Sequence, residues 1–184
     1  VKTLDNSTQM TGAIIIEGHV QGLSNVRSLG EIGIPVYVVD KNSCIARHSK
    51  YCRKFFKCPD FNTDEFALFL IEIAKRENIR KWVLIPSNDH AVYTISRHKA
   101  ELEQYFSIIV PDLDILNLIY DKSRLLSIGR KCGVPIPVTQ YFETADEEVN
   151  NQLSFPVITK GRNGLSFYKA IGKKALLAVD EFEL

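Results

Sequence analysis

Short apolar runs rich in β-branched residues alternate with amphipathic segments over the first 111 residues of the chain. The apolar runs predict buried parallel strands at residues 13–17, 35–40, 55–58, 81–86 and 107–110. Apolar residues spaced three or four apart predict helices at residues 24–32, 62–77 and 89–105. Asn62 or Thr63 would cap the second helix. Strands that alternate with helices indicate an α/β fold with a doubly wound, Rossmann-like parallel sheet of about five strands.

The pattern changes after Pro111. Helices are predicted at residues 112–119, 122–132 and 145–153, with a further helix beginning at 180–184. An extended connector is predicted at 133–137, and strands at 138–142, 155–160 and 175–179. The sequence therefore predicts a disordered lead and two domains, at residues 1–12, 13–111 and 112–184, the last being a small α+β unit.

Composition excludes some classes of function. The 184 residues carry a net charge of +1 and 45% hydrophobic residues, enough for a buried core. A balanced charge does not favour a nucleic acid or a membrane surface as partner, and no apolar stretch is long enough to span a bilayer. The polar N-terminus lacks the apolar region of a signal peptide, so a cytoplasmic location is expected.

Cys44, His48 and Cys52 lie at helical spacing, with Cys58 further on and Cys132 far away. This spacing lacks the Cys-x2-Cys knuckle that is typical of structural zinc sites. Four cysteines in a chain of this size also do not resemble a disulfide framework. Reduced thiols are expected, with no metal site within the chain.

The turn after the first predicted strand contains Gly18, His19, Gly22 and Ser24. Two glycines four residues apart allow the backbone to approach a ligand, and the following helix N-terminus favours an anion. The same turn forms equally well without a ligand, and His19 is either a ligand or base, or a solvent-facing residue. Asp40 ends the second strand, where a ribose-binding acid belongs, but the glycine spacing does not match the nicotinamide fingerprint.

A second polar segment, Ser87 to Asp89, follows the predicted strand 81–86. Open α/β sheets bind ligands at the carboxyl ends of their strands. Alternatively, Ser87 or Asn88 only caps the helix that begins at Asp89. If the first and fourth strands are neighbours, this segment and the turn 18–24 open onto one crevice. The first helix N-terminus and Ser87 would then hold a substrate carboxylate, and Asp89 would attract an amine.

Two lysines have settings that suit a polyphosphate. Lys122 follows Asp121 at the start of a predicted helix, and Lys160 ends the predicted strand 155–160. A polar loop follows Lys160 and contains Gly161, Arg162, Asn163, Gly164 and Ser166. An ammonium group supplies charge, and free N–H groups of such a loop supply directional donors. Taken alone, the position of Lys160 favours a solvated lysine at a strand end.

The order of Asp121-Lys122, the connector 133–137 and the strand ending at Lys160 resembles ATP-grasp carboxylate–amine ligases, such as D-alanine–D-alanine ligase and biotin carboxylase. The glycine turn paired with the Pro-Ser-x-Asp element resembles the first domain of D-aspartate-ligase-like enzymes. The resemblance covers residues 13–184. It implies a pre-ATP-grasp domain followed by the first ATP-grasp subdomain.

The resemblance implies roles for these residues. Lys122 and Lys160 match the two nucleotide lysines of the family, and the loop would cover the phosphates through Gly161, Asn163, Gly164 and Ser166. The acceptor crevice would be bordered by Gly18, His19, Gly22, Ser24, Ser87 and Asp89. No catalytic residue is assigned.

The reaction implied uses ATP and Mg²⁺, converts a small carboxylate into an acyl phosphate, and lets an amine displace the phosphate. The Mg²⁺ ligands would come after Leu184, so the chain alone is expected to be inactive. Two other hypotheses remain: a non-catalytic module that senses a nucleotide or metabolite, and a nicotinamide-dependent oxidoreductase.

Overall fold

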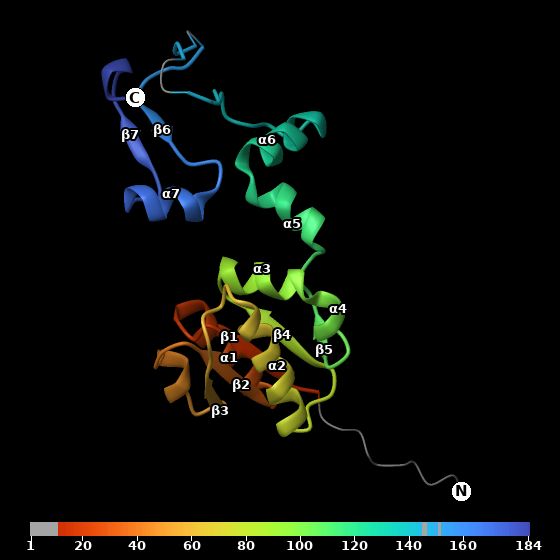
Figure 1. The fold of residues 1–184 in the computed structure, drawn as a ribbon. Coiled ribbons are helices and arrows are strands. Elements are labelled where there is room, and N and C mark those ends of the chain that lie inside the picture. The colour runs from red at the N-terminus through yellow and green to blue at the C-terminus, as the bar shows by residue number, and fades with distance from the viewer. Residues whose placement is uncertain (1–10, 145–146, 151) are drawn as a thin grey trace, which may run out of the picture. The chain divides into compact units, whose positions relative to one another are not determined.

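A computed structural model describes residues 11–144, 147–150 and 152–184 (Figure 1). The predicted disordered lead at 1–12 therefore lies almost wholly outside the described residues. The chain divides into two compact units, residues 1–113 and 114–184. Within the described ranges, no helix is long and apolar enough to cross a membrane.

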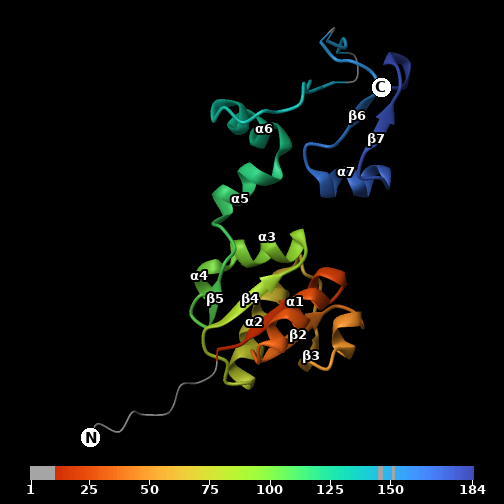
Figure 2. The ribbon, with the colours of Figure 1, turned by 180° about the vertical axis from the view of Figure 1, so that it is seen from behind.

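The first unit contains a sheet of five strands (Figures 1 and 2). The strands are β1 Ala13–Ile16, β2 Val36–Asp40, β3 Cys52–Lys57, β4 Trp82–Pro86 and β5 Phe106–Ile108. All neighbouring pairs are parallel, in the order β3-β2-β1-β4-β5. The direction of winding reverses between β1 and β4, as in doubly wound folds. The predicted fold class is confirmed, although β3 begins earlier and β5 ends earlier than the sequence pattern suggested.

Apolar side chains bury both faces of this sheet. Ile14 and Ile16 of β1 belong to a core cluster that includes residues of the helices α2 (Asp64–Arg76) and α3 (Asp89–Arg97). Ile15 belongs to a second cluster, with Val26 of the helix α1 (Val20–Glu31). Successive strand residues point to opposite faces, so helices must cover both sides of β1. All four β1 residues are buried, which explains why its sequence is continuously apolar.

The helices of the first unit are α1 Val20–Glu31, the 3-10 helix η1 Ile45–His48, α2 Asp64–Arg76, α3 Asp89–Arg97 and α4 Lys99–Leu102. Helix α1 begins at Val20 instead of Ser24, so Gly22 lies inside the helix. A Cβ atom at Gly22 would lie 2.1 Å from the Glu17 carbonyl oxygen, so only glycine permits this early start. The predicted helix 89–105 is broken at His98, whose Nε2 atom lies 2.9 Å from an Asp64 carboxylate oxygen in α2.

The second unit is a small α+β arrangement. Its elements are α5 Leu113–Tyr120, α6 Lys122–Lys131, β6 Val157–Thr159, α7 Gly164–Ile171, β7 Leu176–Ala178 and the 3-10 helix η2 Glu181–Glu183. Strands β6 and β7 form an antiparallel pair. This confirms the two short helices after Pro111 and the strands predicted around residues 155–160 and 175–179.

Two predictions in the second unit are wrong. Residues 138–142 form no strand, and the described residues 147–150, 152 and 153 form no helix; residues 145, 146 and 151 lie outside the description. The Gln140 side chain supplies the reason. Its Nε2 atom donates to the Glu148 carbonyl at 2.7 Å, and its Oε1 atom accepts from Asn150 N at 2.6 Å. One side-chain amide therefore occupies backbone groups that a β-ladder or a helix would use.

Candidate functional site

Lys122 begins α6, and the preceding Asp121 fixes that start. The Asp121 Oδ1 atom accepts from Ser123 N at 2.9 Å, from the Ser123 hydroxyl at 2.6 Å and from Arg124 N at 3.2 Å. The hydrogen bonds from Ser123 and Arg124 lower the pKa of Asp121. Asp121 is thus a helix N-cap, as its residue type favours. Its carboxylate therefore fixes Lys122 as the first residue of α6.

Lys122 also contacts the start of α7. Its backbone N–H donates to the Arg162 carbonyl at 3.2 Å. A Cβ atom built on Gly164 would lie 3.2 Å from the Lys122 Nζ atom, so the ammonium lies against the N-terminus of α7. A helix N-terminus is itself positive, and the first turn of α7 contains no acidic residue. Two positive groups that meet in this way favour a bound anion.

Lys160 lies on the same cavity as Lys122. The cavity has a volume of about 860 Å³ and lies within the second unit. This volume is within the range of roughly 300–1,000 Å³ that is typical of small-molecule sites. Besides the two lysines, Gly161 and Arg162 line it. Its apolar wall is formed mainly by Leu125, Leu126, Val138, Phe142, Leu153 and Val157. An apolar hollow with cations at its rim suits a ligand that has both an uncharged ring and a phosphate chain.

The loop after Lys160 is shorter than the predicted loop of residues 161–166, because α7 begins at Gly164. Residues 164–166 form the first turn of α7, so Gly164 and Ser166 belong to a helix. Asn163 precedes the helix, and its Oδ1 atom accepts from Ser166 N at 3.1 Å. A Cβ atom at Gly161 would lie 2.2 Å from the Phe167 Cβ atom, so glycine lets the loop pack onto α7. The sequence suggested an open loop, whereas the structure has a helix N-terminus.

The neighbouring cation, Arg162, is already paired. Its guanidinium forms an ion pair with Glu143 and lies over the Tyr141 ring, 5.9 Å from the ring centroid. By contrast, no carboxylate of the described residues forms an ion pair with Lys122 or Lys160. These two lysines are therefore the groups of this loop region that remain available to an anion.

The second predicted site lies where β1 and β4 end. Ser87 N donates to the Ile16 carbonyl at 3.0 Å, so the segment after β4 begins beside the end of β1. This confirms that β1 and β4 are neighbours and that both polar segments leave the same edge of the sheet. That His19 and Asp89 contact one ligand stays a prediction.

The individual residues differ in what they offer. His19 caps α1 without a side-chain hydrogen bond and is exposed, as is Ser24. Gly22 is buried against Glu17 and serves packing, which corrects its predicted place in an open turn. Asn88 caps α3, with its Oδ1 atom accepting from Ala91 N at 2.9 Å. The capping alternative is thus confirmed for Asn88.

Sequence reasoning missed Glu17, which follows β1 directly. Its φ of 69° lies in the left-handed region, where a non-glycine residue is strained. The pKa of Glu17 is raised, chiefly by burial. The charge of nearby His19 acts against this shift, and the charge of Asp40 adds to it. The buried Asp40 carboxylate accepts from Gly18 N at 2.8 Å and so fixes the turn. A backbone conformation of this kind leaves no signal in the sequence.

Two buried side-chain atoms at this edge, Ser87 Oγ and Asn88 Nδ2, form no hydrogen bond of regular geometry among the described residues. The Asn88 side chain nevertheless lies close enough to Glu17 to lower the pKa of its carboxyl group. A buried polar group without a partner is costly, so Ser87 Oγ is a position where a ligand or water would be accepted.

The described cysteines are free, and no three His, Cys, Asp or Glu side chains in the described part of the chain gather into a metal site.

Cys58 is 8% exposed, and burial raises its pKa to about 12, whereas Cys132 is exposed. We expect iodoacetamide at about pH 8 to alkylate Cys132 and to spare Cys58, because the thiolate is the reactive form. Peptide mass spectrometry would measure this. Equal modification of both in the folded protein would contradict the buried position of Cys58.

No family model matches this sequence, and no curated protein is similar enough to match it. Several solved structures are similar in fold. N5-carboxyaminoimidazole ribonucleotide synthetase from Thermotoga maritima is 20% identical, with a TM-score of 0.65, over 94% of this chain and 42% of its own. L-amino acid ligase from Bacillus licheniformis is 17% identical, with a TM-score of 0.65, over 94% of this chain and 40% of its own.

A third similar structure is the biotin carboxylase domain of the Hydrogenobacter thermophilus 2-oxoglutarate carboxylase, in complex with MgADP, ADP and bicarbonate. It is 16% identical, with a TM-score of 0.62, over 95% of this chain and 39% of its own. The chain shares its fold with a part of these ATP-grasp enzymes. The ATP-grasp resemblance is thereby confirmed at the level of the fold. The chain spans about two fifths of the length of these proteins.

Proposed function

We propose that this protein is the N-terminal part of an ATP-dependent carboxylate–amine ligase, and that its second unit binds the phosphates of ATP. Residues 13–111 would be the pre-ATP-grasp domain, and 112–184 the first ATP-grasp subdomain. One observation carries the proposal: the Lys122 ammonium lies against the N-terminus of α7, on the cavity that Lys160 also lines. This combination favours a polyphosphate over a neutral ligand.

The residues present would act by binding and by electrostatic stabilisation. When bound, ATP supplies the phosphoryl group that activates a carboxylate as an acyl phosphate, which an amine then displaces. Lys122 and Lys160 would neutralise charge that builds on the phosphates, and the amides at the start of α7, positioned by Asn163, would donate to phosphate oxygens. Gly161 would act by letting the loop pack against Phe167, and Gly164 by leaving room for the Lys122 ammonium. Mg²⁺ would be held by residues expected beyond Leu184.

The acceptor substrate would bind in the first unit, at the carboxyl edge between β1 and β4. Gly18, His19, Ser24, Ser87 and Asp89 remain the proposed contacts, while Gly22 would act through packing. Small-molecule carboxylates and amines fit this edge, where the N-terminus of α1 and polar side chains meet. We propose a cytoplasmic enzyme whose amide-forming activity belongs to a polypeptide that carries the whole fold.

Calorimetric titration of the chain with ADP and with adenosine tests the proposal. We expect ADP to bind at least about tenfold more tightly, because charge-assisted hydrogen bonds to the phosphates supply most of the attraction. Amide-resolved NMR should place the changes at residues 122 and 160–166. Equal affinity for ADP and adenosine, or changes elsewhere, would contradict a phosphate site on these lysines.

The close approach of Lys122 to α7 yields a second prediction. Gly164→Ala would place a Cβ atom 3.2 Å from Lys122 Nζ, so the ammonium would have to move by a few tenths of an ångström. We expect ADP binding to weaken by up to about fivefold, since a charge at a helix end is worth at most about 1 kcal/mol at an exposed site. Gly129→Ala in α6 is the matched control, because its Cβ would meet Ile136 at an ordinary 3.4 Å. Equal effects of the two substitutions would exclude this role for Gly164.

A further inference from the structure

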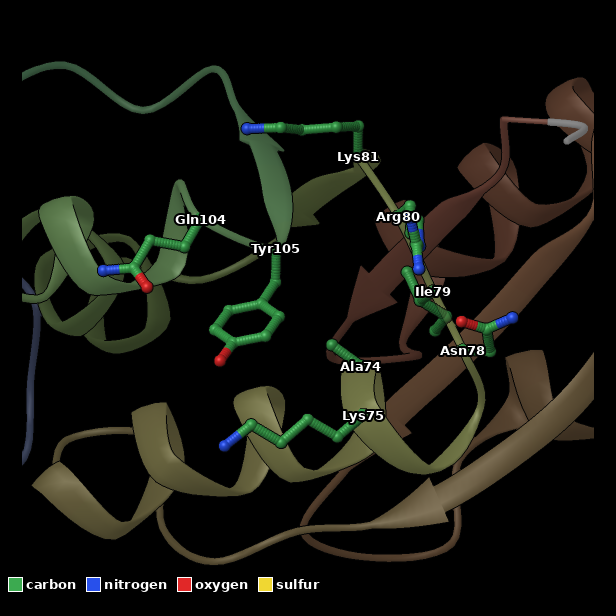
Figure 3. Close-up of a pocket in the computed structure, with 8 residues that line it drawn as sticks. All are labelled: Ala74, Lys75, Asn78, Ile79, Arg80, Lys81, Gln104 and Tyr105. Atoms are coloured by element: carbon green, nitrogen blue, oxygen red, sulfur yellow. The ribbon is translucent and has the colours of Figure 1, made fainter.

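A second hollow lies in the first unit, with a volume of 400 Å³ (Figure 3). It is lined by Ala74 and Lys75 near the end of α2, by residues 78–81 leading into β4, and by Gln104 and Tyr105, which precede β5. Segments that precede parallel strands lie at the amino edge of a sheet. The hollow is therefore on the edge opposite to Glu17 and Ser87, away from the position where doubly wound sheets usually bind ligands.

This hollow is cationic. Lys75, Arg80 and Lys81 line it, and no carboxylate of the described residues forms an ion pair with any of them. Lys75 lies 5.7 Å from the centroid of the Tyr105 ring. Figure 3 shows the Tyr105 ring reaching from the end of the loop before β5 towards α2, with the Lys75 side chain running past it. Its hydroxyl group adds a neutral donor to the cationic wall.

The α2 helix explains only part of this charge. A cation in the last turn of a helix, such as Lys75, is favoured by the helix dipole. Arg80 and Lys81 lie beyond the helix, where this effect has faded. Asn78 has a φ of 50°, but it ends α2 with the usual backbone hydrogen bond from Ile79 N to the Ala74 carbonyl, at 2.8 Å. Its conformation is therefore a helix-capping feature.

Helix capping does not explain the backbone conformation of Lys81. Its φ of 57° is unusual for lysine. Two contacts with β5 and its approach hold it there: Lys81 N donates to the Tyr105 carbonyl at 2.6 Å, and the Ser107 hydroxyl donates to the Lys81 carbonyl at 3.1 Å. Its Nζ atom donates to the Glu103 carbonyl at 2.5 Å. A strained, firmly held cation beside a hollow is typical of a binding site.

We propose that this hollow binds a compact dianionic oxyanion, the phosphate group of a small metabolite or free phosphate. Arg80 would bind two phosphate oxygens with its planar guanidinium, and Lys75 and Lys81 would supply the remaining charge. The Tyr105 hydroxyl and the Gln104 side-chain amide would donate hydrogen bonds to the phosphate oxygens. The volume suits a phosphate with a small organic group and lies at the low end for ligand sites. The proposal does not depend on the ligase function.

The test uses the 184-residue chain with Lys122→Ala and Lys160→Ala, so that phosphate does not bind the second unit. Amide-resolved NMR would follow titrations with inorganic phosphate and with ribose 5-phosphate. We expect saturable changes at residues 78–81 and 104–105. Arg80→Ala should weaken binding about tenfold, the loss expected for one charge-assisted hydrogen-bond partner. Arg53→Ala, an exposed arginine in β3 away from the hollow, is the control.

Each outcome decides the proposal. Tighter binding of ribose 5-phosphate supports a phosphorylated metabolite, and equal binding of the two probes supports free phosphate. NMR changes that do not saturate would show unspecific attraction of phosphate to surface charge and would overturn the proposal. Equal weakening of phosphate binding by Arg80→Ala and Arg53→Ala would overturn it in the same way. Lys81→Gly tests the site a second way. Glycine accepts the left-handed backbone, so this variant should stay folded and still lose affinity.

Discussion

Replacing both Lys122 and Lys160 by alanine is expected to weaken ADP binding on the order of 100-fold, because each charge-assisted hydrogen bond to a phosphate contributes about 1.5–3 kcal/mol. The two ammonium groups share one cavity, and no described carboxylate competes for either of them. The N-terminus of α7 would remain and would retain part of the affinity. Calorimetric titration of the wild-type and variant chains would measure the loss.

The matched control is the double variant Lys169→Ala and Lys173→Ala. These lysines are exposed, belong to the same unit and do not line the cavity, so the net charge changes equally without loss of a proposed contact. We expect its ADP affinity to change less than about threefold at physiological salt, since exposed charges that do not contact the ligand are weakened by solvent and salt screening. Similar losses in both variants would mean that ADP is attracted only by the overall charge.

Phe66→Ala is expected to destabilise the first unit by about 3–5 kcal/mol, the usual cost of removing a buried aromatic side chain and leaving a cavity. Phe66 is 0% exposed and belongs to the core between the sheet, α2 and α3. It also packs edge-to-face against Phe61, with ring centroids 5.3 Å apart. Urea unfolding followed by circular dichroism would measure the change. A loss this large approaches the whole stability of a typical domain.

Leu68→Ala is the control for this prediction, because Leu68 lies in the same helix but is 66% exposed. Its loss should change the free energy of unfolding by less than about 1 kcal/mol. If both variants unfold at the same urea concentration, α2 does not pack on the sheet through the face that contains Phe66. Neither residue is among the proposed ligand contacts, so the two substitutions separate stability from binding.

Much of the first unit was predictable from sequence. Continuous apolar runs identified the strands because parallel strands are buried on both faces, as all of β1 is. Local chemistry offered Ser87 or Asn88 as a helix cap, and the structure has the cap at Asn88. The order of Asp121, Lys122 and Lys160 resembled the ATP-grasp fold. A strand pattern or a cap depends on residues close together in the chain, so the sequence contains it directly.

The sequence by itself predicted the strands of the first unit, the strand pair of the second unit and most helices, and it singled out the two lysines that the proposed function uses. Only the tertiary structure decided how Lys122 meets Gly164, that α7 begins at Gly164, and that Glu17 adopts a left-handed backbone. It also replaced the predicted strand 138–142 with hydrogen bonds from Gln140. In each case the deciding partner lies elsewhere in the chain. Packing and hydrogen bonding between distant segments can outweigh local preference, because they fix groups that local pattern leaves free.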